Sequence, residues 1–140
     1  MQSKSQKFAN VVFTNVRRMA DLQQAGAAAD DDLLARKYKS LCKRAGSLVR
    51  NSGLMQTVAF FEARAGKDDH YRDLRDHLDA EIKALQINTG AASLLDFVRT
   101  RPLPQYMYLT REVLHLLNWH KRLADAMISG TADQQEGDET

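Results

Sequence analysis

Two pairs of acidic and histidine residues have spacings that could serve metal chemistry. Glu112 and His115 are three apart, as in the Glu-x-x-His motif of helical di-iron proteins. Such a site uses two of these motifs and two further glutamates, whereas this sequence has one motif, on the predicted polar flank of its helix. Asp73 and His77 are four apart, but we interpret His77 as part of a charged helix face. The ligands of a metal site cannot be completed, so we predict no metal and no cofactor.

Catalysis has equally little support in the sequence. It contains no H-E-x-x-H motif, no CxxC pair and no glycine-rich phosphate loop. The four histidines fall in helical patterns that packing or surface exposure explains, which leaves the serines without a base. The single cysteine, Cys42, excludes an internal disulfide, favours a reducing cytosol, and is interpreted as a small apolar side chain. We predict that the protein is cytoplasmic, not an enzyme, and takes no small-molecule substrate.

Positive charge is the stronger signal. Residues 33–61 contain six bases and no acid. The apolar residues Leu34, Tyr38, Leu41, Ala45 and Leu48 alternate in steps of four and three, which places them on one side of a helix and the bases on the other. A helix side with one sign of charge is typical of a surface that contacts a polyanion, although long basic side chains can also simply keep a protein soluble.

A second basic helix side precedes this one in the chain, at Arg17 and Arg18. Tyr38 lies between two lysines and could stack on a base, but its place in the apolar stripe favours the core. The predicted nucleic-acid-binding residues are Arg17, Arg18, Arg36, Lys39, Lys43, Arg44 and Arg50.

Trp119 is expected off the packed side of the last helix, near Arg122. Tryptophan and arginine together are typical anchors of protein interfaces, so we predict that Trp119, Lys121 and Arg122 contact another subunit. Two alternatives stay open: Trp119 as a side chain that seals the edge of the bundle, and Lys121 and Arg122 as charges that offset the helix dipole.

Six helices must position these residues. The apolar spacing predicts helices over 5–24, over a basic segment that ends near residue 50, and over 53–65, 68–86, 91–100 and 110–128. Asp30, Asp31 and Asp32 are expected to cap the basic helix and offset its dipole. Pro102 and Pro104 predict an extended turn, and Thr110 a helix cap.

The sequence therefore predicts an all-α, single-domain bundle over residues 1–128, followed by a disordered acidic tail over 129–140. The net charge is +2, but four acids lie in that tail (Asp133, Glu136, Asp138 and Glu139), so the body has 20 bases against 14 acids. A chain of 140 residues can bury enough surface to fold without a metal or a disulfide. No apolar run is typical of a signal peptide or a membrane span.

Several segments resemble the small helical subunit of type III-B (Cmr-type) CRISPR RNA-guided complexes. The likeness includes the opening Phe8-Ala9 helix and extends to about Met127, but it contains no catalytic signature. Its most specific part is the segment after the basic helix, Gly53-Leu54-Met55-Gln56-Thr57-Val58-Ala59-Phe60. Further parts are Lys37-Tyr38-Lys39-Ser40-Leu41, Tyr108-Leu109-Thr110-Arg111-Glu112 and Trp119-His120-Lys121-Arg122-Leu123-Ala124.

The resemblance implies a non-catalytic subunit in antiviral defence that stacks in several copies along the inner side of a prokaryotic complex. Its implied partners are the backbone subunits, the large polymerase-like subunit, copies of itself, guide RNA and target RNA. The basic residues would then hold phosphate and 2′-hydroxyl groups of the RNA. Two alternatives remain: a stand-alone helical regulator that binds DNA or an acidic protein through the same side, and a helical metalloenzyme.

Overall fold

A computed structural model describes residues 1–26 and 28–130 of the chain. The described part is a single bundle of α-helices, which confirms the predicted all-α class. No helix among the described residues has both the length and the apolar character needed to cross a membrane. The six helices are α1 (Lys4–Ala25), α2 (Ala29–Ser52), α3 (Leu54–Ala65), α4 (Asp69–Ala84), α5 (Leu94–Arg99) and α6 (Leu103–Met127).

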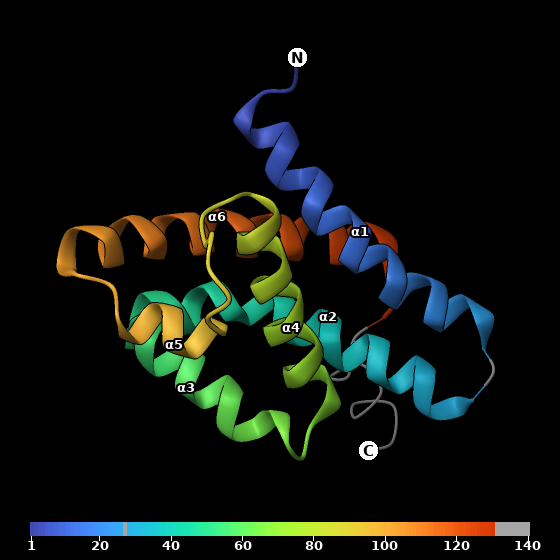
Figure 1. Ribbon diagram of the computed structural model, residues 1–140. Helices are drawn as coiled ribbons and strands as arrows, with labels where there is room; N and C mark the ends of the chain where they lie inside the picture. The colour runs from blue at the N-terminus through green and yellow to red at the C-terminus, as the bar shows by residue number, and fades with distance from the viewer. Residues whose placement is uncertain (27, 131–140) are drawn as a thin grey trace.

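Helix α2 is the centre of the bundle, because it packs against α1, α3, α4 and α6 (Figure 1). Its apolar stripe is fully buried at Tyr38, Leu41 and Ala45. Leu74 of α4 and Leu116 of α6 are equally inaccessible, and the buried core also includes residues of α1, α3 and α5. The other side of α2 is more exposed and carries most of the bases.

The α2–α3 corner depends on Gly53. Its φ of 87° and ψ of 160° lie in a region that essentially only glycine adopts. The Gly53 carbonyl accepts a hydrogen bond from the N–H of Thr57, so α3 begins directly after this glycine. The Tyr106 hydroxyl accepts from the N–H of Met55, so α6 also fixes this corner.

Two predicted helix ends are wrong. The last helix begins at Leu103 instead of Thr110, because Pro104 sits in its first turn, where a missing N–H removes no helical hydrogen bond. The Thr110 hydroxyl donates to the Tyr106 carbonyl inside the helix and caps nothing. At the start of α2 the N-cap is Ala28, which makes no side-chain bond; the three aspartates lie in the first turn, where they still offset the dipole.

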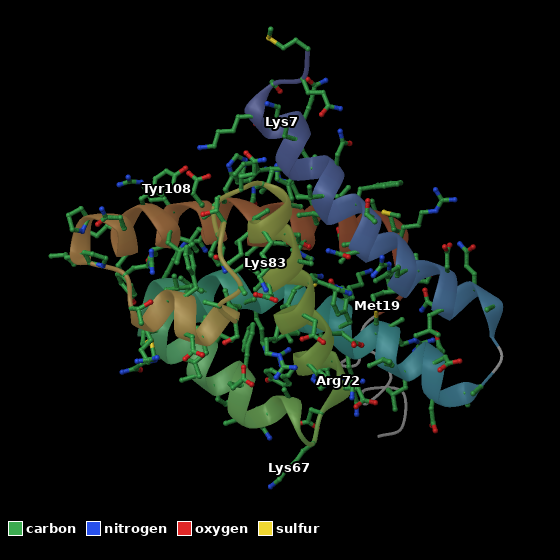
Figure 2. The ribbon with its side chains drawn as sticks, in the orientation of Figure 1. Lys7, Met19, Lys67, Arg72, Lys83 and Tyr108 are labelled. Carbon is green, nitrogen blue, oxygen red and sulfur yellow. The ribbon has the colours of Figure 1, made fainter. Side chains whose placement is uncertain are left out.

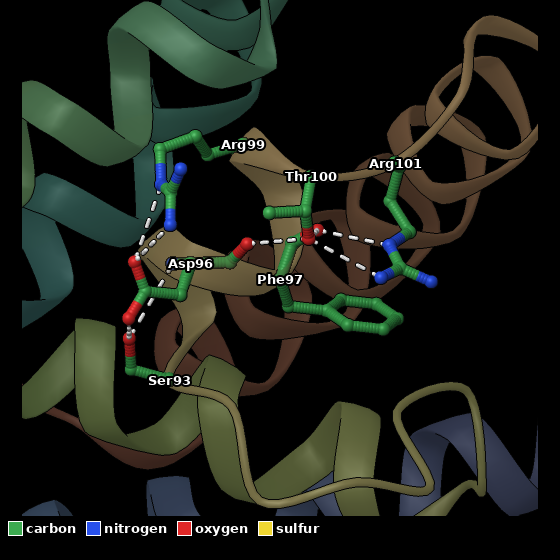
Figure 3. A network of polar contacts seen from close by, with 6 residues as sticks. All are labelled: Ser93, Asp96, Phe97, Arg99, Thr100 and Arg101. Atoms are coloured by element: carbon green, nitrogen blue, oxygen red, sulfur yellow. Dashed lines mark hydrogen bonds and ion pairs between the residues drawn. The ribbon is translucent and has the colours of Figure 1, made fainter.

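The short helix α5 is held by polar contacts at both ends (Figure 3). The Ser93 hydroxyl accepts from the N–H of Asp96, and the Asp96 carboxylate pairs with Arg99 at 3.1 Å. The Thr100 hydroxyl donates back to the Asp96 carbonyl, and the Arg101 guanidinium lies 4.4 Å from the centre of the Phe97 ring. These contacts stop the helix and direct the chain into α6.

Helix α4 has the predicted mixture of charges on its outer side (Figure 2). Of the four predicted pairs, Asp79 with Lys83 forms, at 3.0 Å. Arg72 instead pairs with its nearer neighbour Asp69, and Arg75 reaches across to Glu62 of α3. The mixed signs make this side of the bundle a poor surface for a polyanion.

The chain beyond α6 is fixed as far as the described residues go. Ile128 is extended and buried, and Lys39 donates from Nζ to its carbonyl at 2.7 Å. The Gln23 side chain donates to the Ser129 carbonyl and accepts the Ser129 N–H. Residues 131–140 of the predicted acidic tail lie outside the described residues.

Candidate nucleic-acid interface

Most bases of α2 lie on the side of that helix that the other helices leave most exposed. At about 100° per residue, Arg36, Lys43 and Arg50 are seven apart and follow one edge of this side. Lys43 lies 3.7 Å from Asp125, which identifies this edge as the one next to α6. Arg44 marks the opposite edge, because it donates to the Tyr71 hydroxyl of α4. We call Arg36, Lys37, Lys43, Arg44 and Arg50 the basic face of α2.

Carboxylates lie close to part of this face. Lys37 lines a cleft of about 280 Å³ together with Asp30, Asp68 and Asp69. Arg36 pairs with Asp32 of its own helix at 3.1 Å, and Asp125 is shared by Lys39 and Lys43 at 3.7 Å. Lys37 and Arg50 form no ion pair with any residue of the described ranges 1–26 and 28–130. Exposed pairs such as that of Lys43 contribute at most about 1 kcal/mol, so a phosphate can replace them.

Lys39 was predicted to belong to this surface, but the structure places it inside. The residue is 7% exposed, and its ammonium holds the Ile128 carbonyl. The side chain therefore ties the end of α6 to α2 and has little access to a ligand.

The structure does not bring the two predicted basic residues of α1 to the basic face of α2. Arg18 lines a cleft of about 250 Å³ between α1 and α4, together with Ala80 and Ala84. Arg17 is exposed and lies 3.8 Å from Asp21, one turn along its own helix. The predicted two-helix surface is thus at least two separate basic areas.

The predicted subunit-interface residues lie along α6. Trp119 is partly buried and packs against the core, as expected of a residue that seals the edge of the bundle. Lys121 and Arg122 are exposed, one turn before Asp125, and neither pairs with a carboxylate in the described part of the chain. They lie on α6, which packs beside α2.

The residue types suited to catalysis meet elsewhere, in a sealed polar cluster between four helices. His120 of α6 is fully buried and donates from Nε2 to both oxygens of the Glu81 carboxylate at 2.8 Å. Asn15 of α1 donates to the same carboxylate at 2.7 Å. The Tyr38 hydroxyl of α2 lies 3.1 Å from Nδ1 of His120 and 2.7 Å from Nδ1 of His77 of α4.

The charges of this cluster follow from its geometry. Burial alone would lower the pKa of His120, but the adjacent Glu81 carboxylate raises this pKa to about 10. Burial and the positive His120 lower the pKa of His77 to about 3, while burial raises that of Tyr38. An imidazolium at His120 therefore donates to the Tyr38 oxygen, and the Tyr38 hydroxyl donates to neutral His77.

Three sequence-based expectations about polar side chains were tested by this packing. The burial of His120 and Tyr38 is confirmed. The interpretation of His77 as a member of the charged surface is wrong, because it accepts the Tyr38 hydrogen bond from within the bundle.

The expected position of Glu112 on the polar flank is also wrong. It is 4% exposed and pairs with Lys4 of α1 at 2.9 Å. His115 does not join it as a ligand, since its ring stacks on Phe8 with centres 4.6 Å apart. Within residues 1–26 and 28–130 no group of three or more potential ligands could hold a metal ion.

Comparison with known proteins assigns the bundle to a family. The family model described as CRISPR-associated protein (Cas_Cmr5) matches residues 4–127. This chain belongs to the Cmr5 family. The family comprises small subunits of the Cmr, or type III-B, CRISPR complex, so the resemblance seen in the sequence is confirmed.

A relative and a solved structure agree with the Cmr5 assignment. The CRISPR system Cmr subunit Cmr5 of Thermus thermophilus is 31% identical, over 91% of this chain and 98% of the relative. The crystal structure of a CRISPR-associated Cmr5 family protein from the same organism matches with a TM-score of 0.70 at 26% identity. That match covers 92% of this chain and all of the solved one.

In this Cmr5 family member, residues 53–60, the most specific segment of the resemblance, contribute side chains to both the core and the surface. Leu54 and Val58 are buried, whereas Gln56 and Phe60 are exposed. These two exposed residues line a cavity of about 250 Å³ between α2 and α3, whose other lining residues are Leu48, Ser52 and Thr57. Sequence reasoning missed this cavity, although the exposed position of Phe60 off the apolar stripe was a signal for it.

Proposed function

We propose that this Cmr5 family member is a non-catalytic small subunit that contacts RNA in a type III-B CRISPR complex through the basic face of α2. The proposal rests on the basic face of α2. This face carries five bases between Arg36 and Arg50, and that segment of the sequence contains no acid. Family membership provides the RNA-guided context.

The chemistry of this face fits phosphate contacts better than base reading. Its members are lysines and arginines on a rigid helix, which position a nucleic-acid backbone without distinguishing sequences. The surface runs along α2 from Arg44 to Lys43, which lies next to Asp125 of α6. An RNA strand or an RNA duplex could follow this surface along the bundle.

The absence of catalysis is part of the same proposal. The titratable groups that meet in space, Glu81, His120 and Tyr38, are at most 1% exposed, so they present almost no surface to a substrate. Their donors and acceptors are already used by one another. The cluster therefore stabilises the bundle, and cleavage of RNA belongs to another subunit of the complex.

Assembly partners follow from the family. The T. thermophilus relative is named as a subunit of the Cmr system, which supports contacts of this chain with backbone subunits, with the large polymerase-like subunit and with copies of itself. Exposed apolar residues at the start of α6 supply a surface for such contacts; they are Leu103, Met107 and Tyr108. Trp119, Lys121 and Arg122 supply a second surface on the same helix.

Charge reversal on α2 tests the RNA contact. We expect the substitutions Lys43→Glu, Arg44→Glu and Arg50→Glu together to weaken capture of target RNA by the assembled complex. The slope of log affinity against log salt should shrink by about 0.7 for each lost phosphate contact on a single strand. Filter binding or fluorescence anisotropy at several salt concentrations measures both quantities.

A matched control carries the same change of net charge on other helices. Arg72→Glu, Lys83→Glu and Arg99→Glu alter bases of α4 and α5 that lie outside the basic face, of which Figure 2 labels Arg72 and Lys83. This variant should retain the salt slope of the unmodified complex. Equal RNA capture by both variants and by the unmodified complex at low salt would reject the basic face as an RNA surface.

A further inference from the structure

The cavity between α2 and α3 has features that the proposed phosphate contacts do not use. It measures about 250 Å³, close to the lower end of ordinary small-ligand sites, which suits one planar ring system. Its lining consists of Leu48, Phe60 and three side chains that can form hydrogen bonds, Ser52, Gln56 and Thr57, with no carboxylate among them.

Phe60 gives the cavity an aromatic surface. The ring is 41% exposed, although other aromatic residues of α3 and α4, such as Phe61 and Tyr71, are buried. Tyr71 contacts the Phe60 ring edge to face, with centres 5.5 Å apart, and the Arg64 guanidinium lies 5.4 Å from its centre. These neighbours hold the ring in place and still leave much of it accessible.

The polar side chains of the cavity are available to a ligand. Ser52 and Gln56 are exposed, and their side chains form no hydrogen bond with any residue that the structure describes. Thr57 donates its hydroxyl hydrogen to the Gly53 carbonyl, which leaves its oxygen free to accept. A heterocycle with donors and acceptors on its edge could form hydrogen bonds with both the donors and the acceptors of these side chains.

The charge beside the cavity is positive and continuous with the basic face of α2. Arg44 precedes Leu48 by one turn and donates to the Tyr71 hydroxyl, which brings it near Phe60. Arg64 adds a second guanidinium, whose one ion pair within the described part of the chain is an exposed contact with Asp68 at 3.5 Å. A ligand in the cavity would therefore have cationic groups on the side where a phosphate would lie.

We infer that this cavity holds one unpaired nucleobase of an RNA strand whose phosphates lie on the basic face of α2. Phe60 stacks on the base, Gln56 and Ser52 bond its edge, and Arg44 contacts a flanking phosphate. Stacking accepts every base, so the site anchors a strand without selecting a sequence. The inference rests on the proposed function, because it assumes that RNA reaches the basic face.

The test compares two RNA probes of equal charge against the purified full-length chain. One is a single-stranded oligomer that contains 2-aminopurine, and the other carries abasic riboses at the corresponding positions. We expect the chain to bind the probe with bases between about 5-fold and about 100-fold more tightly, with quenching of the 2-aminopurine fluorescence. Phe60→Leu should remove most of this preference and the quenching, and leave affinity for the abasic probe unchanged.

Every other outcome rejects a specific part of the proposal. Equal affinity for both probes, or an unchanged preference in Phe60→Leu, rejects the base site and leaves the phosphate contacts standing. Failure to bind either probe at low salt rejects the base site, and the charge-reversal variant in the assembled complex then decides the phosphate contacts. If Phe60→Leu keeps the preference but no longer enters the complex, the cavity belongs to a protein partner. Ala59→Ser, at an exposed neighbouring position outside the cavity lining, is the control and should behave as the unmodified chain.

Discussion

His120 of α6 and Glu81 of α4 form an ion pair that is closed off from solvent, with the histidine Nε2 atom 2.8 Å from both carboxylate oxygens. Two charges in such a place stabilise a protein only while both are present, because either one alone is left buried without compensation. Asn15 and Tyr38 supply the remaining hydrogen bonds, so the pair joins four helices.

Glu81→Gln should therefore be strongly destabilising. The substitution keeps the shape of the side chain but leaves the His120 charge without its partner, and we expect the free energy of unfolding to fall by about 3–5 kcal/mol. Urea denaturation followed by circular dichroism measures this. Glu62→Gln, which breaks an exposed pair with Arg75, should cost no more than about 1 kcal/mol. Similar losses in both variants would contradict the role given to the buried pair.

Stability should have a maximum near pH 6.5. The folded chain raises the pKa of His120 to about 10 from the ordinary 6.5, so it binds the proton more tightly than the unfolded chain does. This contribution is complete below pH 6.5 and is lost as the pH rises towards 10. His70 and His77, with pKa values lowered to about 4 and about 3 chiefly by burial, act in the opposite way and reduce stability as the pH falls below 6.5.

Melting temperatures between pH 4 and pH 10 test this profile. His120→Gln should flatten the alkaline limb and leave the acid limb in place, whatever its effect on the overall stability. An alkaline slope that is the same in the variant and the unmodified chain would mean that another group causes it.

Lys39 and Lys43 should have separate roles, although they are one turn apart. Lys39→Met leaves the Ile128 carbonyl without its partner, and we expect a loss of about 1–3 kcal/mol in stability with RNA capture unchanged. Lys43→Met should change stability by no more than about 0.5 kcal/mol and weaken RNA capture. Chemical denaturation and RNA-binding measurements on both variants test this prediction. It would be wrong if Lys39→Met weakened RNA capture and Lys43→Met reduced stability.

Gly53→Ala should disturb the α2–α3 corner. A side chain is strained at this φ and ψ by about 1–3 kcal/mol, and the corner also positions Phe60. Gly66→Ala provides the matched control, since Gly66 has helical dihedral angles and open space where the methyl group would lie. Thermal melting should show a lower midpoint for Gly53→Ala and an equal or higher one for Gly66→Ala.

The sequence was sufficient for most of the fold because the apolar spacing of each helix is strong. It placed Tyr38 and His120 in the core, and it found the charged outer side of α4. Its errors concern polar side chains whose partners are distant in the chain: Glu112 is paired by a lysine 108 positions away, and His77 by Tyr38, 39 positions away. Periodicity assigns such residues to the surface, since it contains no information on which helix will lie opposite.

The candidate interface was harder to predict than the fold. The bases of α2 could be identified as one side of a helix, but Lys39 lies at the edge of that side, where the chain after α6 covers it. Arg18 was grouped with the same surface because sequence cannot tell how α1 crosses α2. The cavity beside Phe60 arises where two helices meet, so neither helix pattern alone reveals it.

The hydrogen bonds of Ser129 with Gln23 affect where a label can be attached. They hold the chain after α6 at the junction of α1 and α2, so a fluorophore attached at Ser129 or Gly130 would lie close to Lys39 of α2. Figure 1 shows the opposite end of α1 projecting from the bundle. Ser3, at that end, is the better neighbour for a reporter group, because a dye there would not compete with an incoming strand.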